Sequence, residues 1–592
     1  MTYLTRRQAQ AIAESVLAGF NRHYVLFRSI SAKAKELFEL AQWLEIQKLV
    51  ADRIRMYDDR VLETVEKLRL EFVPSTLNEV LWKDVKLAYS VLLINHKQPE
   101  LAETFFNSVS NKILAKDYFN NDLIFLKPTI STEYIDSEVV AIKYFYPQEG
   151  GLRQLIQSIL LYFDWKVPFK NIKQDVENIF QKGKQFLLEN WVSDELNLHI
   201  RVLHSPFYRN KCTYIFGEII NGNDKYPFAI SVVNRERKLA VDAALFDTKQ
   251  IAVLFSFSRA YFLVEMAVPS TYVNFLKGLL PMRDKSDFYT MLGLQKQSKN
   301  IFFREFNAHL RSSSDLFILA PGIKGMVMVV FTLPSFPYVF KVIRDYFGPN
   351  KNFDQNYVRK KYELVKKHDR VGRLADTLEY TNVAIPASRC DEEMFNELKE
   401  LAPSKIELRK DLLIIKHVYV ERRLKPLNLV MKTATPEERE SLIIEYGDTL
   451  KDLATANIFP GDMLYKNFGV TRYKKLIFYD YDEIEYMTHC HFKKIPAAPN
   501  PEYELSDEVW YPVEPGDVFP EEFGTFLLNE PDLRKVFLQH HAELLTTEFW
   551  QKKKDNILAG IVEDFYPYPE SERFKSEPAS SCVNKSGSSF HE

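Results

Sequence analysis

The chain has few cysteines, few glycines and almost no net charge. Only Cys212, Cys390, Cys490 and Cys582 occur among 592 residues, and no two of them form a CxxC pair. This spacing excludes a disulfide framework and a cysteine-based zinc site, and it favours a reducing, cytoplasmic compartment. The 19 glycines are too few for a fibrous or low-complexity protein. With 78 Lys and Arg against 80 Asp and Glu, the charge balance gives no reason to expect nucleic acid as a partner.

The sequence also lacks a long uninterrupted hydrophobic run. The most apolar stretch, residues 251–268, contains Arg259 and Glu265, and each of these charges would be costly in a lipid bilayer. The first 20 residues lack a continuous apolar core and a small-residue cleavage site, which favours a helix of the mature protein over a signal peptide. We therefore expect no membrane association, and a buried strand and helix at residues 251–268.

The first 310 residues show helical periodicity followed by alternating strands. Apolar residues recur at helical spacing behind a possible capping box of Thr5 and Gln8, and helices are predicted to about residue 190. From about residue 196, alternating and β-branched stretches predict strands, including a hairpin. His199 and His204 flank a predicted strand without a partner at metal-ligand spacing. A half without visible chemistry suggests regulation or partner recognition.

Residues 457–484 carry the clearest chemical pattern. Asp462 precedes Asn467 by five residues, and Asn467 precedes Asp480 by thirteen, with an apolar run leading into the last acid. A phosphoryl-transfer site needs one carboxylate to accept a hydroxyl proton, and an amide oxygen and a second carboxylate to hold Mg²⁺ on ATP phosphates. Taken alone, the same residues also fit an acidic surface turn followed by an edge strand.

A nucleotide-binding pattern lies upstream. Gly322 and Gly325 form a turn between two predicted strands and would let backbone N–H groups approach phosphates closely. Lys341 follows inside an apolar strand, where an ammonium group should be paired or bound to phosphate. Either Glu363 or Glu379 could be its partner, and the sequence does not choose between them.

Two further elements complete the order expected of a kinase. Residues 417–421 are interpreted as a short extended crossover whose main-chain groups could read an adenine edge, although this segment considered alone favours simply another strand and turn. Pro436, with Glu437 and Glu438 behind it, begins a helix that leads into the loop of Asp462. The whole order is glycine turn, strand lysine, crossover, helix, Asp and Asn loop, strand and second acid, which favours phosphoryl transfer over a chance surface turn.

The segment from about Ala320 to Ile484 resembles the bacterial isocitrate dehydrogenase kinase/phosphatase family. The resemblance is carried by the motifs APGIKGM, FKVIRDYFGPNK, HDRVGRLADTLEY, ERRLKPLN, NIFPGDMLYKNFGV and FYDYDEI. It extends over nearly the whole chain, with the exception of the tail after about residue 570.

The resemblance implies an α+β fold in which a mostly helical regulatory domain with a β-containing portion, residues 1–310, precedes a bilobal protein-kinase-like domain, residues 311–592. It implies a cytoplasmic enzyme, either a monomer or a homodimer, that phosphorylates a serine of isocitrate dehydrogenase with Mg²⁺-ATP and removes that phosphate at the same site. Flux between the tricarboxylic acid cycle and the glyoxylate bypass would be controlled in this way. AMP would act on the regulatory domain.

The resemblance also assigns roles to individual residues. Lys341 and the glycine turn would hold ATP or ADP, Asp462 would be the kinase base, and Asp376 would be an active-site acid. Asn467 and Asp480 would hold Mg²⁺. The turn consists of Ala320, Pro321, Gly322, Ile323, Lys324, Gly325 and Met326.

The chain departs from typical protein kinases at two positions of the motif. Pro460-Gly461 stands where His-Arg is expected, which argues against control by a phosphorylated activation loop. Asp482 stands where a glycine is expected and adds an acid beside the metal. Phosphatase activity needs a base that orients water, and Asp376 and Asp482 are the acids available for it.

The sequence also contains an insert and a tail, and it is compatible with two alternative functions. A proline-rich and acidic insert near residues 493–525 could grip a folded protein substrate or could simply be solvated, and a disordered tail is expected from about residue 570. A small-molecule kinase of the same general fold is an alternative function. A non-catalytic pseudokinase is another, although such proteins commonly lose one or more of the residues retained here.

Overall fold

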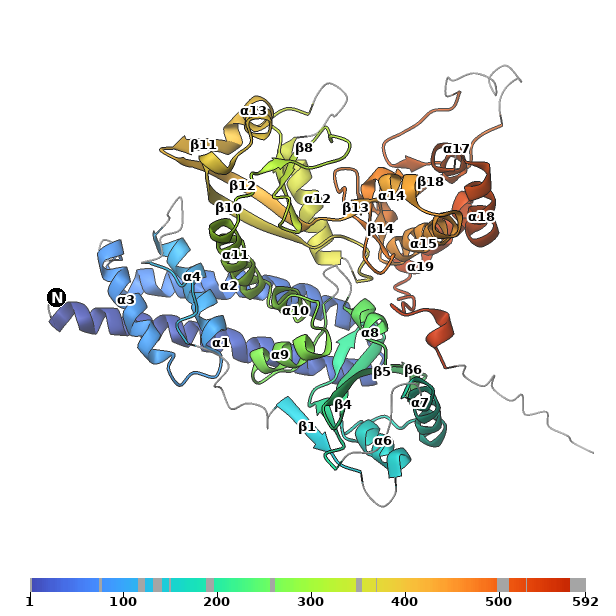
Figure 1. Ribbon diagram of the computed structural model, residues 1–592, viewed down its shortest axis with the longest axis horizontal. Helices are drawn as coiled ribbons and strands as arrows, with labels where there is room; N and C mark the ends of the chain where they lie inside the picture. Colours follow the sequence, from blue (N-terminus) through green and yellow to red (C-terminus); the bar gives the residue numbers. More distant parts are fainter. Residues whose placement is uncertain are drawn as a thin grey trace, which may run out of the picture.

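The computed structural model describes residues 3–73, 77–114, 123–130, 141–147, 151–187, 196–255, 261–347, 354–368, 370–497, 510–528 and 530–574. The fold class is α+β, as predicted. A helical region and a first antiparallel sheet form the N-terminal half, and a second sheet with a helical lobe forms the C-terminal half (Figure 1). No helix among the described residues is long and apolar enough to cross a membrane.

The N-terminal helices form a bundle around a shared apolar core. The core includes Val16 and Phe20 of the first helix together with Val61 and Val65 of the second. The predicted capping box at Thr5 is wrong, because the first helix already includes Tyr3. The four helices are α1 (Tyr3–Glu39), α2 (Trp43–Glu71), α3 (Glu79–Leu92) and α4 (Pro99–Leu114).

The first sheet is antiparallel and has the strand order β1-β2-β4-β5-β6, with β3 paired to β4. The hairpin predicted from the sequence is β5 and β6, joined by a turn in which Glu236 and Arg237 have positive φ. One face of the sheet shares a core with α6 (Gly151–Leu161) and α7 (Ile172–Leu187). The strands are β1 (Ile142–Phe145), β2 (His199–Leu203), β3 (Phe207–Arg209), β4 (Cys212–Asn221), β5 (Asp224–Arg235) and β6 (Lys238–Leu245).

Residues 251–268 are buried, as expected, in the part that the structure describes. Ile251 and Leu254 lie on a short helix, and Phe262 and Leu263 follow in an extended segment that bridges to Tyr208. The helices of this region are α8 (Thr248–Leu254), α9 (Pro269–Leu279), α10 (Lys285–Met291) and α11 (Gln295–Ser312). Phe302 and Phe306 of α11 pack into the core of the second sheet, so this helix joins the two halves (Figure 1).

The second sheet has the strand order β10-β12-β9-β8-β7, with β11 paired to β12, and every pairing is antiparallel. The interpretation of residues 417–421 as a crossover is wrong, because they lie inside β12, where all five pair with β10 and residues 419–421 also pair with β9. The strands are β7 (Ile318–Leu319), β8 (Met328–Thr332), β9 (Tyr338–Ile343), β10 (Thr377–Pro386), β11 (Ile406–Arg409) and β12 (Leu412–Arg422). Two helices accompany them, α12 (Gln355–His368) and α13 (Glu392–Leu401).

The C-terminal lobe is built around α15 (Pro436–Thr455). Its predicted start is confirmed: Thr435 and Glu438 form a capping box with Pro436 in the first turn. The other helices are α14 (Leu427–Thr433), α17 (Phe523–Leu527), α18 (Pro531–His541) and α19 (Thr547–Leu558). The strands are β13 (Lys425–Pro426), β14 (Ile458–Phe459), β15 (Phe468–Val470), β16 (Leu476–Phe478), β17 (Glu485–Tyr486), β18 (His491–Phe492) and β19 (Asp517–Val518).

The insert and the tail are described in part. Residues 498–509 of the insert lie outside the described residues, while β19 pairs with β18 at its end and the Trp510 indole donates to the Pro496 carbonyl, 3.1 Å away. The tail was expected to begin at about residue 570, but residues 570–574 dock on β6. The Arg573 guanidinium forms an ion pair with Asp242 at 2.9 Å. Residues 575–592 lie outside the described residues.

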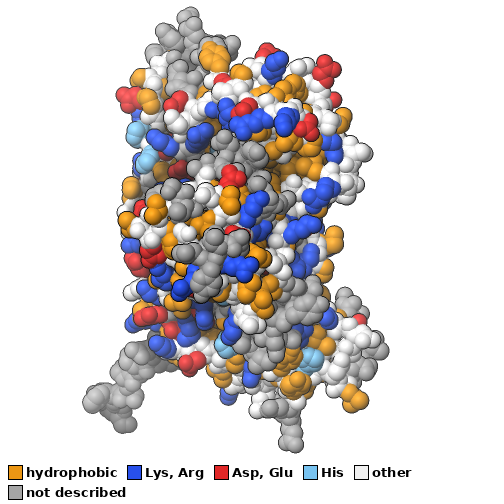
Figure 2. All heavy atoms as spheres, turned by 90° about the vertical axis from the view of Figure 1, so that its left-hand side faces the viewer, with side chains coloured by type: hydrophobic (Ala, Val, Ile, Leu, Met, Phe, Trp, Pro, Cys, Tyr) orange, Lys and Arg blue, Asp and Glu red, His pale blue; other side chains and the backbone are white. Residues whose placement is uncertain are grey.

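Charged side chains of both signs are interspersed on the face shown in Figure 2. Exposed hydrophobic side chains lie among them on this face.

Candidate active site

The loop of Asp462 follows β14 and is held by hydrogen bonds from its own residues. The Asn467 side-chain amide donates to the Asp462 carbonyl at 3.1 Å, and the Leu464 N–H donates to the Asp462 carboxylate at 3.0 Å. Asn467 is buried, and its carbonyl accepts a hydrogen bond from the Tyr479 N–H on the following strand. Asp462 and Asn467 are therefore fixed relative to the chain that leads into Asp480.

Gly461 explains the departure from the usual kinase sequence. It has a φ of 74°, and a Cβ at this position would lie 2.3 Å from the Glu483 carbonyl oxygen. An arginine cannot occupy such a position, because both the backbone conformation and the contact require glycine. The pairing of β14 with β17 brings the Asp462 loop against the segment that follows Asp482.

Lys341 lies on β9 and is paired, but its partner is Glu421 and not the predicted Glu363 or Glu379. The Lys341 ammonium lies 2.7 Å from the Glu421 carboxylate and donates to the Tyr479 carbonyl at 2.9 Å. Tyr419 is opposite Lys341 in the pairing of β12 with β9, so Glu421, two residues on, is a diagonal neighbour on the same face. Glu379 instead contacts His417 at 2.9 Å.

Asp480 and Asp482 bring two carboxylates together at the end of β16. Burial raises the pKa of Asp480 well above its usual range, contact with Asp482 raises it further, and nearby Lys341 opposes the shift. The negative charge of nearby Asp462 also raises the pKa of Asp480. Lys341, Asp462, Asp480 and Asp482 thus share one electrostatic environment at the junction of the two lobes.

This arrangement suits a divalent cation. Two facing carboxylates disfavour joint ionisation without a counter-charge, and the buried Asn467 is hydrogen-bonded to Tyr479, the residue before Asp480. The described residues contain no cluster of three or more His, Cys, Asp or Glu side chains suited to a metal. Mg²⁺ does not need one, because one or two carboxylates and substrate phosphates complete its shell.

The glycine turn lies between β7 and β8, with Ala320 bonded to Val330 at its base. Residues 321–326 are exposed. Lys324 is not free in the turn, since its ammonium forms ion pairs with Glu393 and Glu397 on α13. These contacts hold Lys324 at the α13 side of the sheet.

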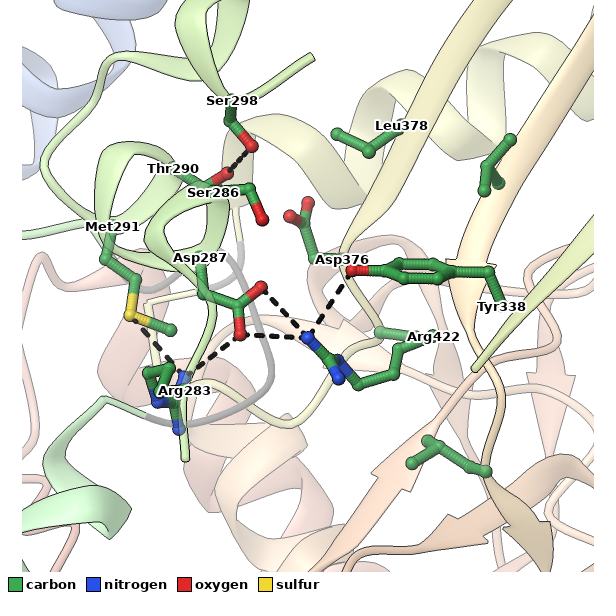
Figure 3. Close-up of a pocket in the computed structure, with 13 residues that line it drawn as sticks. Arg283, Ser286, Asp287, Thr290, Met291, Ser298, Tyr338, Asp376, Leu378 and Arg422 are labelled. Carbon is green, nitrogen blue, oxygen red and sulfur yellow. Dashed lines mark hydrogen bonds and ion pairs between the residues drawn. The ribbon is translucent and has the colours of Figure 1, made fainter. Parts of the chain in front are cut away.

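Asp376 lines a cavity that Asp480 does not line. It stands immediately before β10, on the wall of a cavity of about 40 Å³ between the two halves of the chain, and its carboxylate points toward α10 (Figure 3). Arg422, at the end of β12, forms ion pairs in this cavity with Asp284 and Asp287 at 2.7 and 3.1 Å. Asp376 is nevertheless near the other site, because it contributes to the raised pKa of Glu421.

The segment before Asp376 is also held by the N-terminal half of the chain. The side chains of Arg209 and Asn210, at the turn between β3 and β4, donate to the carbonyls of Val371 and Arg370 at 3.0 and 2.9 Å. On its other side, the Ala375 N–H donates to Phe478 of β16. Residues 370–375 therefore connect the first sheet to β16, which leads into the Asp480-Tyr481-Asp482 turn.

Sequence reasoning missed the residues that fix α12 against the site. The Tyr362 ring stacks on Tyr419 with centroids 4.0 Å apart and meets Tyr481 edge-on at 5.0 Å. Lys361 adds an ion pair of 2.6 Å with Glu485. In this chain α12 is therefore joined to the Asp480-Tyr481-Asp482 turn by aromatic contacts. The tyrosines of α12, β12 and the Asp480-Tyr481-Asp482 turn were visible in the sequence, but no spacing rule connected them.

The comparisons with known proteins agree with this geometry. The sequence model of the isocitrate dehydrogenase kinase/phosphatase (AceK) regulatory domain matches residues 13–314, and that of the AceK kinase domain matches residues 315–570. The isocitrate dehydrogenase kinase/phosphatases of Aromatoleum aromaticum and Azoarcus sp. are 52% and 53% identical to this chain, each with 96% of both sequences covered. That of Methylibium petroleiphilum is 50% identical over 97% of this chain and 94% of its own length. Domain models that together span residues 13–570, and relatives this similar over nearly their whole length, show that the chain belongs to the isocitrate dehydrogenase kinase/phosphatase family.

Proposed function

We propose that this protein transfers the γ-phosphoryl group of ATP to a serine of isocitrate dehydrogenase and removes the phosphate at the same site. The observation that carries the proposal is the gathering of Lys341, Asp462, Asn467 and Asp480 at the junction of the lobes. A pseudokinase would not need all four. The relatives' name, isocitrate dehydrogenase kinase/phosphatase, supports the choice of substrate over a small molecule.

In this proposal each side chain has a separate task. Lys341, held by Glu421, binds phosphate oxygens, and residues 320–326 cover the nucleotide. Asp462 accepts the proton of the serine hydroxyl. Asn467 and Asp480 are the Mg²⁺ ligands, and the cation, when bound, neutralises charge that develops on the phosphates.

The phosphatase direction needs a base that orients water against the phosphoserine. Asp376 and Asp482 are the candidates. Asp482 contacts Asp480 directly, whereas Asp376 approaches the same region from the Glu421 side. Either position is compatible with a shared nucleotide site.

The remaining parts of the proposal concern regulation and assembly. We place AMP as an effector of the N-terminal half, divide the chain at about residue 310, and assign the insert at residues 493–525 to contact with the protein substrate. The protein would act in the cytoplasm, and a homodimer is the assembly to be tested. Light scattering of the purified protein with and without AMP would measure its mass and any change in assembly.

The proposed function is tested by incubation with Mg²⁺-ATP and purified isocitrate dehydrogenase. We expect phosphate to appear on a serine of the partner and to be released when ADP is added. Intact ATP binding without transfer to that protein would overturn the proposal, and transfer to small-molecule acceptors alone would favour a small-molecule kinase.

A further inference from the structure

A second cavity lies in the regulatory half, remote in sequence from the catalytic motif. It is bounded by α6, α7 and the face of the first sheet formed by β2, β4 and β5, and its volume is about 320 Å³. It is open to solvent on one side, and its lining residues Pro147 and Leu152 are exposed. Figure 1 shows α6 and α7 beside this sheet, away from the catalytic lobes. Every side chain that lines the cavity is apolar except that of Lys184.

The walls of this cavity belong to a well-buried core. Ile159, Ile179 and Ile230 are each no more than 3% exposed. Gly183 of α7 packs closely against the Phe246 ring, because a Cβ there would lie only 3.1 Å from it. Protein interiors are ordinarily packed with few voids larger than a water molecule, so an open apolar pocket of this size next to buried side chains is unusual.

Of the charged side chains near the opening of the cavity, some form ion pairs and one does not. Arg153 and Glu177 are bound to each other at 2.7 Å, and the Arg153 guanidinium also stacks on Phe180. Lys184, in the last turn of α7, is exposed and makes no ion pair within the described part of the chain. The cavity therefore has an apolar interior and one available cation at its edge.

We propose that this cavity binds an unbranched fatty acid, with the acyl chain inside and the carboxylate at Lys184. An apolar cavity of about 150 Å³ accommodates benzene, so by proportion about twelve carbon atoms fit here. A nucleotide or sugar is a poor fit, because such ligands require several polar groups along the walls. The site is separate from the nucleotide site and does not depend on the proposed catalytic function.

Titration calorimetry of the full-length protein with octanoate, decanoate and laurate, below their micelle concentrations, tests the proposal. We expect saturable binding of one acid per chain. Affinity should rise by about fourfold for each methylene added, which is the value of burying one such group, and should level off near twelve carbons. Absence of saturable binding, or an affinity independent of chain length, would overturn the proposal.

Two variants separate the cavity from general surface binding. Ile156→Trp places a large ring in the cavity from a half-buried position on α6, and it should abolish laurate binding while leaving the unfolding temperature equal or higher. Lys184→Met should weaken laurate binding by about fivefold, the upper range for an exposed ion pair, without weakening dodecanol.

Lys173→Met is the matched control, because Lys173 is exposed on α7 but does not line the cavity. It should bind laurate as the unmodified protein does. Unchanged laurate affinity in Ile156→Trp, or equal losses in the two lysine variants, would contradict the assignment. If Ile156→Trp does not fold, the comparison of the lysine variants decides the result alone.

Discussion

Asp480 and Asp376 both lie near the Lys341 and Glu421 pair, but they reach it from different parts of the fold. Asp480 follows β16, and its neighbours Asp462 and Asp482 come from the same short stretch of chain. Asp376 precedes β10 and shares its cavity with residues of α10, such as Asp287. The acids around Asp480 therefore form a local motif within one short stretch of chain. Asp376 instead contacts the cavity shared with α10, so changes in the N-terminal half can reach the site through it.

The largest effect is expected at the local motif. Asp480→Asn should lower both kinase and phosphatase rates by at least about a thousandfold, because the variant loses a carboxylate ligand for the cation that stabilises transferred charge. Phosphate transfer to isocitrate dehydrogenase and its release would be measured with the same preparation.

The unfolding temperature of Asp480→Asn serves as the control for misfolding. The folded-state pKa of Asp480 is raised, so its protonated form favours folding, and this contribution is lost as pH rises through the folded-state value. Without Mg²⁺, Asp480→Asn should therefore unfold at an equal or higher temperature at pH 7. Lower stability together with lower activity would indicate misfolding and remove the result as support for a metal ligand.

A smaller loss of kinase activity is expected when the Glu421 carboxylate that pairs with Lys341 is removed. Glu421→Gln keeps the shape of the side chain and its contact with Thr377 but removes the charge that pairs with Lys341, and we expect kinase activity to fall by about 10- to 100-fold, as for outer partners of metal ligands. Steady-state rates with varied ATP check this.

Glu363→Gln is the control, since Glu363 was one of the two partners first expected for Lys341. It should retain more than half of the kinase rate. A larger loss in Glu363→Gln than in Glu421→Gln would contradict the pairing in the structure.

Asp376→Asn tests the side of the site that faces α10. If Asp376 is the base that orients water, the phosphatase rate should fall by about a hundredfold or more, the usual contribution of a general base, while the kinase rate falls by less than about tenfold. The two rates are measured separately, on phosphorylated and unphosphorylated isocitrate dehydrogenase.

Asp482→Asn is the matched variant for this comparison. A full phosphatase rate in Asp376→Asn with a large loss in Asp482→Asn would exclude Asp376 and assign the base to Asp482. Loss of both activities to the same extent in Asp376→Asn would instead indicate a positioning role at the boundary of the two halves.

The same contrast explains how much could be predicted from the sequence. The loop of Asp462, the strand that leads to Asp480 and the strand lysine were predictable, because each depends on local periodicity, turns and spacing. The pairing of Lys341 with Glu421 was not, because it depends on the order in which distant strands enter the sheet. For the same reason, the contacts that connect Asp376 to α10 and to Arg209 could be found only in the folded structure.

The crossover at residues 417–421 shows a second limit. A short extended segment next to charged residues has the same local pattern whether it connects two lobes or lies inside a sheet. Here both edges of β12 are paired, with β10 and with β9, so the segment is interior. The local sequence pattern predicted the extended conformation of residues 417–421 correctly, but the prediction that they connect two lobes was wrong.

The smallest effect on catalysis is expected in the helical bundle of the regulatory half, where His23 is buried. Burial and nearby Arg60 lower the pKa of His23 to about 4. Because the folded state disfavours the charged ring, this contribution to stability is complete above the unfolded pKa of 6.5 and is lost as pH falls toward 4. The loss reaches about 3 kcal/mol at the lower end, since each pKa unit corresponds to about 1.4 kcal/mol.

His23→Phe should remove most of this acid sensitivity without changing kinase or phosphatase rates at neutral pH. The unfolding temperature of the unmodified protein should fall faster between pH 6.5 and 4 than that of the variant. His540→Gln is the control, because His540 is exposed and its substitution should leave the pH dependence unchanged. Parallel pH profiles for His23→Phe and the unmodified protein would contradict the buried neutral state of His23. A change in either catalytic rate would show that the helical bundle acts on the catalytic half as well as on stability.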